Sequence, residues 1–291
     1  MEQKNGLSLV GLIFTIVIVL FGLAILMPLH GRKPNIARRV ICGTNLKGLG
    51  NAMMVYANDY DGNYLQLPGI GPWSKELGFA FDLEKPDFIA KGAEGKTSRT
   101  ITASWYLLVR EADVSPKSFV CPTSKQKDFD GKNSANRDLV DLWDFGNNPY
   151  QHVSYAMHNP YGKFPAHRTR PASFAVAADM NPWMVNGDFI QAGKNNTQPQ
   201  IITLTDNATW KLGNSYHHRI KRDMEGQNVL YADGHTAYET RPNVGVHYDN
   251  IYTYWSTEKE PGEQDIQGGT APTGRTADND AKSEEDSFLA I

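Results

Sequence analysis

Residues 7–27 read LSLVGLIFTIVIVLFGLAILM, a run of 21 residues without a charged side chain. As an α-helix this run would be roughly 30 Å long, which matches the hydrocarbon core of a bilayer. A buried core helix is usually shorter. A cleaved secretory signal would need small residues at its end, and residues 26–30 read LMPLH. The sequence therefore predicts a transmembrane helix over residues 7–29.

A second helical pattern follows and predicts a stalk helix over residues 30–58. Its apolar residues are spaced four, three, four and three apart and would share one helix face: Cys42, Leu46, Leu49, Met53 and Tyr56. Gly43, Gly48 and Gly50 each weaken a helix by up to ~1 kcal/mol relative to alanine. We therefore expect this helix to pack on the rest of the protein rather than to stand alone.

Residues 59–255 read as a β-rich globular domain. One short helix is predicted over residues 102–111, and strands over residues 118–120, 152–157, 173–178, 200–205, 228–232 and 236–239. Asp233-Gly234 lies between the last two strands and predicts a hairpin. The expected fold class is α+β, with a long N-terminal helix packed on an antiparallel sheet.

Residues 256–291 have a different composition. They carry nine acidic and three basic residues, with no tryptophan or tyrosine. Such a segment buries little apolar surface, so we expect a disordered acidic tail.

Charge and motifs exclude several classes of function. The 29 basic and 32 acidic residues give a net charge of −3, so no nucleic-acid partner is expected. The sequence contains no phosphate-binding loop, nucleotide fingerprint or catalytic triad spacing, so we do not expect an enzyme. The two cysteines, Cys42 and Cys121, either form one disulfide in an oxidising compartment or stay as two buried thiols.

The N-terminus resembles that of type IV prepilins and pseudopilins. Lys4-Asn5-Gly6 precedes the apolar run, as in their short basic leaders, and Pro28 would be mature residue twenty-two, where pilins commonly have a proline. The resemblance implies that residues 1–6 are a prepilin-type leader. A prepilin peptidase would cleave it between Gly6 and Leu7, and Leu7 would then be N-methylated. The fifth mature residue is usually glutamate and aids filament assembly, whereas this chain has Gly11. Whether such a chain assembles into a filament is left open.

The resemblance also bears on location. A count of flanking positive charges favours a cytoplasmic side for the residues after the helix: Arg32, Lys33, Arg38 and Arg39. That rule weakens for long translocated domains. The pilin resemblance implies a single-pass cytoplasmic (inner) membrane protein, with the globular domain periplasmic or extracellular.

The domain is similar to a pilin-like family of planctomycetes and related bacteria, which is named for a histidine, nine residues and Asp-Gly. Residues 226–235 (GQNVLYADGH), 119–122 (FVCP) and 249–253 (DNIYT) carry this likeness. The signature histidine is displaced, because Asp223 occupies its position. The nearest candidates are His217 and His218.

The resemblance suggests that several polar side chains meet at one end of the sheet: Asp179, His217 or His218, Asp233 and His235. Imidazole and carboxylate ligands suit zinc or another divalent ion. The competing interpretation is a purely structural Asp-Gly turn. No cofactor is otherwise expected.

Two functions follow. The first is a pseudopilin-like structural protein of a type II secretion or type IV pilus-type system, whose partners are the lipid bilayer, a prepilin peptidase and other pseudopilins or secretion-system proteins. The second is an anchored extracytoplasmic module that binds a ligand, such as a glycan or divalent metal, and does not assemble into a filament.

Overall fold

The computed structural model describes residues 8–26, 33–87, 99–190, 199–220 and 223–291. The chain forms two compact units, residues 1–38 and 39–291, which are described separately. The helices are α1 (Leu9–Leu26), α2 (Lys33–Asp59), α3 (Ile101–Glu111), α4 (Asn207–Leu212) and α5 (Glu263–Gln267). The strands are β1 (Tyr155–His158), β2 (Ala175–Asp179), β3 (Met184–Val185), β4 (Asp188–Phe189), β5 (Arg219–Ile220), β6 (Asp223–Met224), β7 (Gln227–Tyr231), β8 (Thr236–Glu239) and β9 (Leu289–Ala290).

Helix α1 forms from the apolar run of the first unit and has 18 residues. The predicted leader (1–6) and both ends of the predicted transmembrane span (7 and 27–29) lie outside the described residues. Among the residues that are described, no helix combines the length and the apolar character that crossing a membrane requires.

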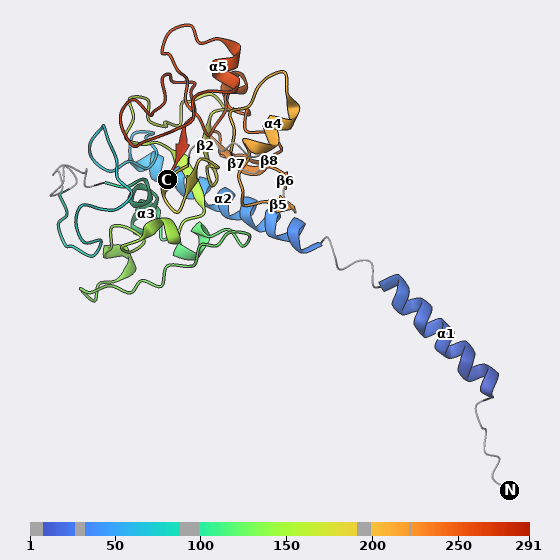
Figure 1. The fold of residues 1–291 in the computed structure, drawn as a ribbon. Coiled ribbons are helices and arrows are strands. Elements are labelled where there is room, and N and C mark those ends of the chain that lie inside the picture. The colour runs from blue at the N-terminus through green and yellow to red at the C-terminus, as the bar shows by residue number, and fades with distance from the viewer. Residues whose placement is uncertain (1–7, 27–32, 88–98, 191–198, 221–222) are drawn as a thin grey trace. The chain divides into compact units, whose positions relative to one another are not determined.

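Helix α2 confirms the helix predicted after the apolar run, except for residues 30–32, which lie outside the described residues. From Arg39 onward α2 belongs to the second unit. Its predicted apolar face is buried at all five positions: Cys42, Leu46, Leu49, Met53 and Tyr56. Helix α2 lies against the sheet (Figure 1). The backbone of Gly43 approaches the side chain of Asn228, and that of Gly50 approaches the side chain of Leu230. Gly48 points away from any neighbour.

The main sheet has five antiparallel strands in the order β8-β7-β2-β1-β9. The α+β class is therefore confirmed, with α2 packed on an antiparallel sheet. The β7–β8 hairpin is also as predicted: Gly234 adopts a φ of +83° in its turn, a conformation that glycine tolerates well.

Both faces of the sheet are buried. Alternating residues of β1 and β7 divide between two apolar clusters, with Met157 and Leu230 on the side of α2, and Ala156 and Val229 on the other. Two tryptophans are almost fully buried in these clusters. Trp105 of helix α3 lies in the cluster on the side of α2, and Trp183 lies in the other. This double burial explains why β2 reads as a continuous small apolar run.

The elements outside the main sheet agree less well with the predictions made from the sequence. Helix α3 confirms the helix predicted over residues 102–111. The strand predicted over residues 118–120 is wrong, because Pro116–Phe119 forms a 3-10 helix with proline in its first turn. Residues 200–205 form no strand in the described structure, although Thr203 makes one isolated bridge to Asp206.

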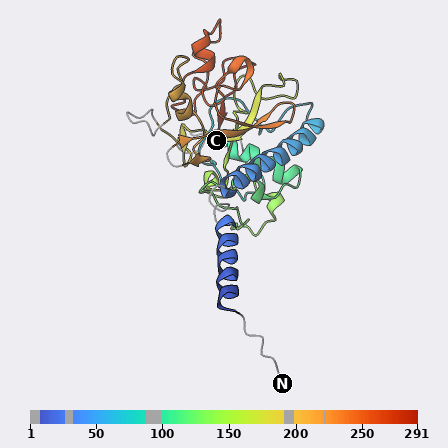
Figure 2. The same cartoon turned by 90° about the vertical axis from the view of Figure 1, so that its right-hand side faces the viewer.

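The prediction of a disordered tail over residues 256–291 is wrong. Its last strand, β9, pairs with β1 and completes the main sheet; Phe288 is fully buried (Figure 2 shows this domain from a second side). The carboxylate of Asp286 accepts hydrogen bonds from the backbone N–H groups of Trp255 and Lys282. The tail is ordered because its acidic residues bond to backbone and its final residues are apolar, which an averaged composition hides.

Candidate functional site

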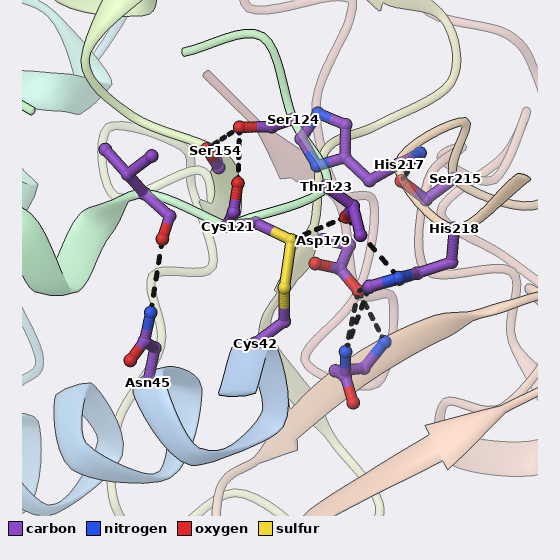
Figure 3. The surroundings of a disulfide bond; sticks show 12 residues. Cys42, Asn45, Cys121, Thr123, Ser124, Ser154, Asp179, Ser215, His217 and His218 are labelled. Atoms are coloured by element: carbon purple, nitrogen blue, oxygen red, sulfur yellow. Dashed lines mark hydrogen bonds and ion pairs between the residues drawn. A yellow bond between two sulfur atoms is a disulfide. The ribbon is translucent and has the colours of Figure 1, made fainter. Parts of the chain in front are cut away.

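A disulfide joins helix α2 to the segment after the 3-10 helix Pro116–Phe119. It links Cys42 to Cys121 across 79 residues of sequence, with 5.1 Å between their Cα atoms, and both residues are fully buried (Figure 3). The sequence left open whether the two cysteines form a disulfide or stay as buried thiols, and the structure shows the disulfide. Disulfides persist in oxidising compartments, so the bond indicates an extracytoplasmic domain.

A buried histidine–carboxylate pair lies beside this disulfide. The Nε2 atom of His218 is 2.9 Å from Oδ2 of Asp179, the last residue of β2, and the two side chains are only 5% and 0% exposed. Asn228 donates to the same carboxylate oxygen from its backbone N–H at 2.7 Å and from its side-chain amide at 3.1 Å. The sheet itself therefore fixes the position of Asp179, because Asn228 is the second residue of the neighbouring strand β7.

Thr123 connects the pair to the disulfide. Its hydroxyl oxygen lies 2.9 Å from Sγ of Cys121 and 3.5 Å from Nδ1 of His218. Figure 3 shows the resulting cluster, in which the two sulfur atoms, the carboxylate of Asp179 and the imidazole of His218 face one another. One ligand atom from each of these four residues lies within 4.8 Å of all the others.

This donor set is chemically suited to a metal ion. Cysteine sulfur, imidazole nitrogen and carboxylate oxygen are the ligands of zinc sites. A metal binds thiolates, however, and the sulfur atoms here are joined to each other. In the oxidised chain, the cluster offers a metal only Asp179 and His218.

Two side chains of this region keep polar atoms unsatisfied. Oδ1 of Asp179 and both ring nitrogens of His217 are buried without a hydrogen-bond partner among the described residues. Burial lowers the pKa of His217 to about 4, so its ring is neutral at neutral pH. Each buried polar atom without a partner lowers the free energy of unfolding by about 1–3 kcal/mol, so these atoms reduce the stability of the fold.

Asp233 and His235 form a second, exposed pair in the β7–β8 turn. Oδ1 of Asp233 accepts hydrogen bonds from the backbone N–H and from the ring of His235. Partial burial alone would raise the pKa of the Asp233 carboxyl, but the bonds from His235 outweigh it and hold the pKa below its usual range. The His235 ring also stacks on Tyr231, with 4.4 Å between ring centroids.

The same turn is attached to helix α2. The ammonium group of Lys47 donates to the carbonyl oxygen of Gly234 at 2.6 Å. The contacts of Asp233 and His235 are therefore those of a structural turn that docks on the helix, which is the competing interpretation of the Asp-Gly sequence.

The expectation that Asp179 and one of the two histidines meet Asp233 and His235 at one end of the sheet is wrong. Asp179 lies beside the start of β7, because its neighbour Ala178 pairs with Val229, whereas Asp233 follows the end of β7. The two groups are thus at opposite ends of that strand. His217 and His218 also separate: His218 faces Asp179, while the ring of His217 packs edge-on against Tyr216.

Two residues that contact this cluster could not be predicted from the sequence. Thr123 and Asn228 belong to no recognisable motif, and only the folded chain brings them to His218. The cysteines were recognised as a pair, but their proximity to Asp179 depends on the register between β2 and β7.

A polar groove lies elsewhere on the domain, with a volume of about 570 Å³. Its lining includes two arginine–aromatic pairs: Arg39 lies 4.1 Å from the ring centroid of Tyr238, and Arg241 lies 4.8 Å from that of Trp210. Asp223 and Glu225 line it as well.

Comparison with known proteins leaves the family open: no protein-family model matches the chain, no curated protein is similar to it, and no solved structure matches it.

Proposed function

We propose that this protein is a membrane-anchored, pseudopilin-like structural protein whose globular domain lies outside the cytoplasm. It would act in a type II secretion or type IV pilus-type system, without a catalytic role. The bilayer, a prepilin peptidase and other pseudopilins would be its partners.

The packing of helix α2 on the sheet is the observation that carries this proposal. The helix buries one complete apolar face, including Leu46, Leu49 and Met53, against the antiparallel sheet. A long N-terminal helix laid on an antiparallel sheet is the architecture that the pilin resemblance implies. The disulfide from Cys42 supports an extracytoplasmic position of this domain.

The anchor and its processing rest on the sequence. Residues 7–27 are uncharged, and Gly6-Leu7 stands where the resemblance implies cleavage. An anchor that is retained after cleavage would hold the domain at the membrane surface, whereas a secretory signal would release it.

Mass spectrometry of the mature N-terminus tests the proposal. The full chain is expressed together with a prepilin peptidase and purified from membranes. We expect a chain that begins at N-methylated Leu7, and we expect Gly6→Val to retain Met1. Gly22→Val, a matched substitution within the apolar run, should leave processing unchanged. A wild-type chain that keeps Met1 in the presence of the peptidase would contradict the proposal.

A second candidate is an anchored binding module, and the polar groove favours it. Two guanidinium groups, of Arg39 and Arg241, line one depression next to the aromatic side chains of Tyr238 and Trp210. The three basic side chains of the lining, from Arg39, Lys211 and Arg241, outnumber its two acidic ones, from Asp223 and Glu225. Together with the aromatic rings they suit an acidic glycan, through ion pairing and ring stacking.

Binding of an acidic oligosaccharide, measured by calorimetry, separates the two candidates. Arg241→Ala should weaken binding roughly 10- to 100-fold if the groove is the site, because a hydrogen bond to a charged group contributes about 1.5–3 kcal/mol. Arg168→Ala, outside the groove, is the control. A chain that binds no acidic oligosaccharide would contradict the groove as a glycan site.

A further inference from the structure

The Cys42–Cys121 disulfide and the buried Asp179–His218 pair beside it form one cluster that contains a reducible bond. We propose that reduction of the Cys42–Cys121 disulfide converts this cluster into a four-coordinate zinc site made by the two thiolates, Asp179 and His218. This inference does not depend on the proposed pseudopilin role.

The four ligand atoms are already close to the required positions. They lie within 4.8 Å of one another, and all four residues are buried. In a tetrahedral zinc site, bond lengths of about 2.0–2.3 Å place ligand atoms roughly 3–4 Å apart. Side-chain shifts on the order of 1 Å would therefore suffice, with the two sulfur atoms moving apart after the bond breaks.

The unsatisfied oxygen of Asp179 is an independent observation that points to a ligand. Oδ2 accepts two hydrogen bonds from Asn228 and lies 2.9 Å from Nε2 of His218, whereas Oδ1 is buried and has no partner among the described residues. A zinc ion bound to Oδ1 would satisfy this atom. The bonds of Asn228 to Oδ2 would at the same time hold the carboxylate in orientation.

The second coordination shell is also present. A histidine that binds zinc usually donates its other ring N–H to a neighbouring oxygen. The hydroxyl of Thr123 lies 3.5 Å from Nδ1 of His218 and can accept that hydrogen bond when Nε2 binds the metal.

The charge of the proposed metal state suits a buried site. The two positive charges of zinc offset two of the three negative charges that the two thiolates and one carboxylate carry as ligands. The site would therefore hold one net negative charge in a region from which water is excluded.

The redox step needs an external two-electron reductant, such as a dithiol. The bond between the sulfur atoms breaks, one S–H bond forms on Cys42 and one on Cys121, and the dithiol becomes a disulfide. Zinc then replaces the two thiol protons, which pass to solvent. The soft thiolates favour zinc over calcium or magnesium.

Cobalt binding to the full-length chain in non-ionic detergent tests the proposal. The disulfide is reduced with a phosphine, which takes an oxygen atom from water and becomes a phosphine oxide. Thiol counting under denaturing conditions establishes that reduction is complete, since both sulfur atoms are buried. The phosphine is then removed without oxygen, and Co²⁺ is titrated in.

We expect the reduced chain to bind one Co²⁺, with the visible bands of tetrahedral cobalt and a thiolate charge-transfer band, and Zn²⁺ to displace it. The oxidised chain should show neither band. Asp179→Asn and His218→Gln should each weaken binding by about 100-fold or more. His235→Gln, in the other histidine–aspartate pair, should leave it unchanged.

Three results would overturn the proposal. They are a reduced chain that binds no Co²⁺, an oxidised chain with the same spectrum as the reduced one, and a loss of affinity in His235→Gln equal to that in His218→Gln. The comparison of reduced and oxidised wild-type chain decides the matter even where a variant fails to fold.

Discussion

Gly50 of helix α2 lies against Leu230 of strand β7 so closely that a methyl group at position 50 would be 2.5 Å from Cδ1 of the leucine. Leu230 is itself buried in the core between helix and sheet. The glycine thus sets how near the helix comes to the sheet. Gly48, two residues earlier, faces open space.

The two glycines therefore predict opposite effects of the same substitution. Gly48→Ala should raise the free energy of unfolding by up to ~1 kcal/mol, because alanine favours the helix. Gly50→Ala should lower it by about 1–2 kcal/mol, because overpacking against Leu230 exceeds the gain in helix propensity. Chemical denaturation of both variants measures the difference. Equal stabilisation by both would contradict the close packing of α2 on β7.

The C-terminal segment is predicted to be part of the core. Phe288 is fully buried and packs edge-on against Tyr254, with 5.7 Å between ring centroids. Phe288→Ala should lower the free energy of unfolding by about 3–5 kcal/mol. Lys259→Ala, at an exposed position of the same segment, should change it by less than about 0.5 kcal/mol. If both variants were as stable as wild type, the segment would not be packed in solution.

Two buried carboxyl groups predict a pH dependence of stability. Burial raises the pKa of Asp286 to about 7, and burial together with the nearby Asp286 raises that of Asp249. The folded chain therefore binds more protons than the unfolded chain, in which an aspartate has a pKa of about 4. The stabilisation from Asp286 is fully present below pH 4 and is lost as the pH rises to about 7, by a few kcal/mol.

Asp286→Asn tests this prediction, because an amide is neutral at every pH. Denaturation is followed from pH 4 to pH 8 in both proteins. The stability of the variant should fall less than that of wild type over this range. Parallel curves would show that Asp286 does not hold its proton in the folded state.

The disulfide is predicted to be a large contributor to stability. A bridge that closes a loop of 79 residues restricts the unfolded chain, which in the loop-entropy model is worth about 4–5 kcal/mol. Replacing both cysteines by serine should lower the free energy of unfolding by about 2–5 kcal/mol in denaturant titrations. A loss below about 1 kcal/mol would mean that the packing of α2 alone fixes this region.

The sequence predicted those parts of the fold that follow from local patterns. The buried face of α2 repeats with the helical period, and Asp233-Gly234 has the conformational freedom of a hairpin turn. The pairing of β9 with β1 has no local signal, because the apolar end of the chain is short and follows a polar stretch. Phe119 lies in an apolar run that reads as a strand, but Pro116 fixes a 3-10 turn instead.

The sequence predicted individual residues of the candidate site but not how they are grouped. The resemblance indicated Asp179 and His218 as polar residues near the sheet, but it grouped them with Asp233 and His235. In the structure, Asp179 lies beside the start of β7, whereas Asp233 follows its end. The register of β7 on β2 sets this separation. The position of the cysteines next to Asp179 depends on the same register and on the packing of α2.

The disulfide also decides how the domain responds to mechanical load. Tension that enters the domain along helix α2 reaches Cys42 within about one helical turn of Arg39. From there it crosses directly to Cys121, so the chain between the two cysteines, including the rest of α2 and helix α3, is bypassed and cannot be pulled straight. While the bond is intact, the domain resists being unravelled from its N-terminal side; once the bond is reduced, the same pull would peel α2 from the sheet.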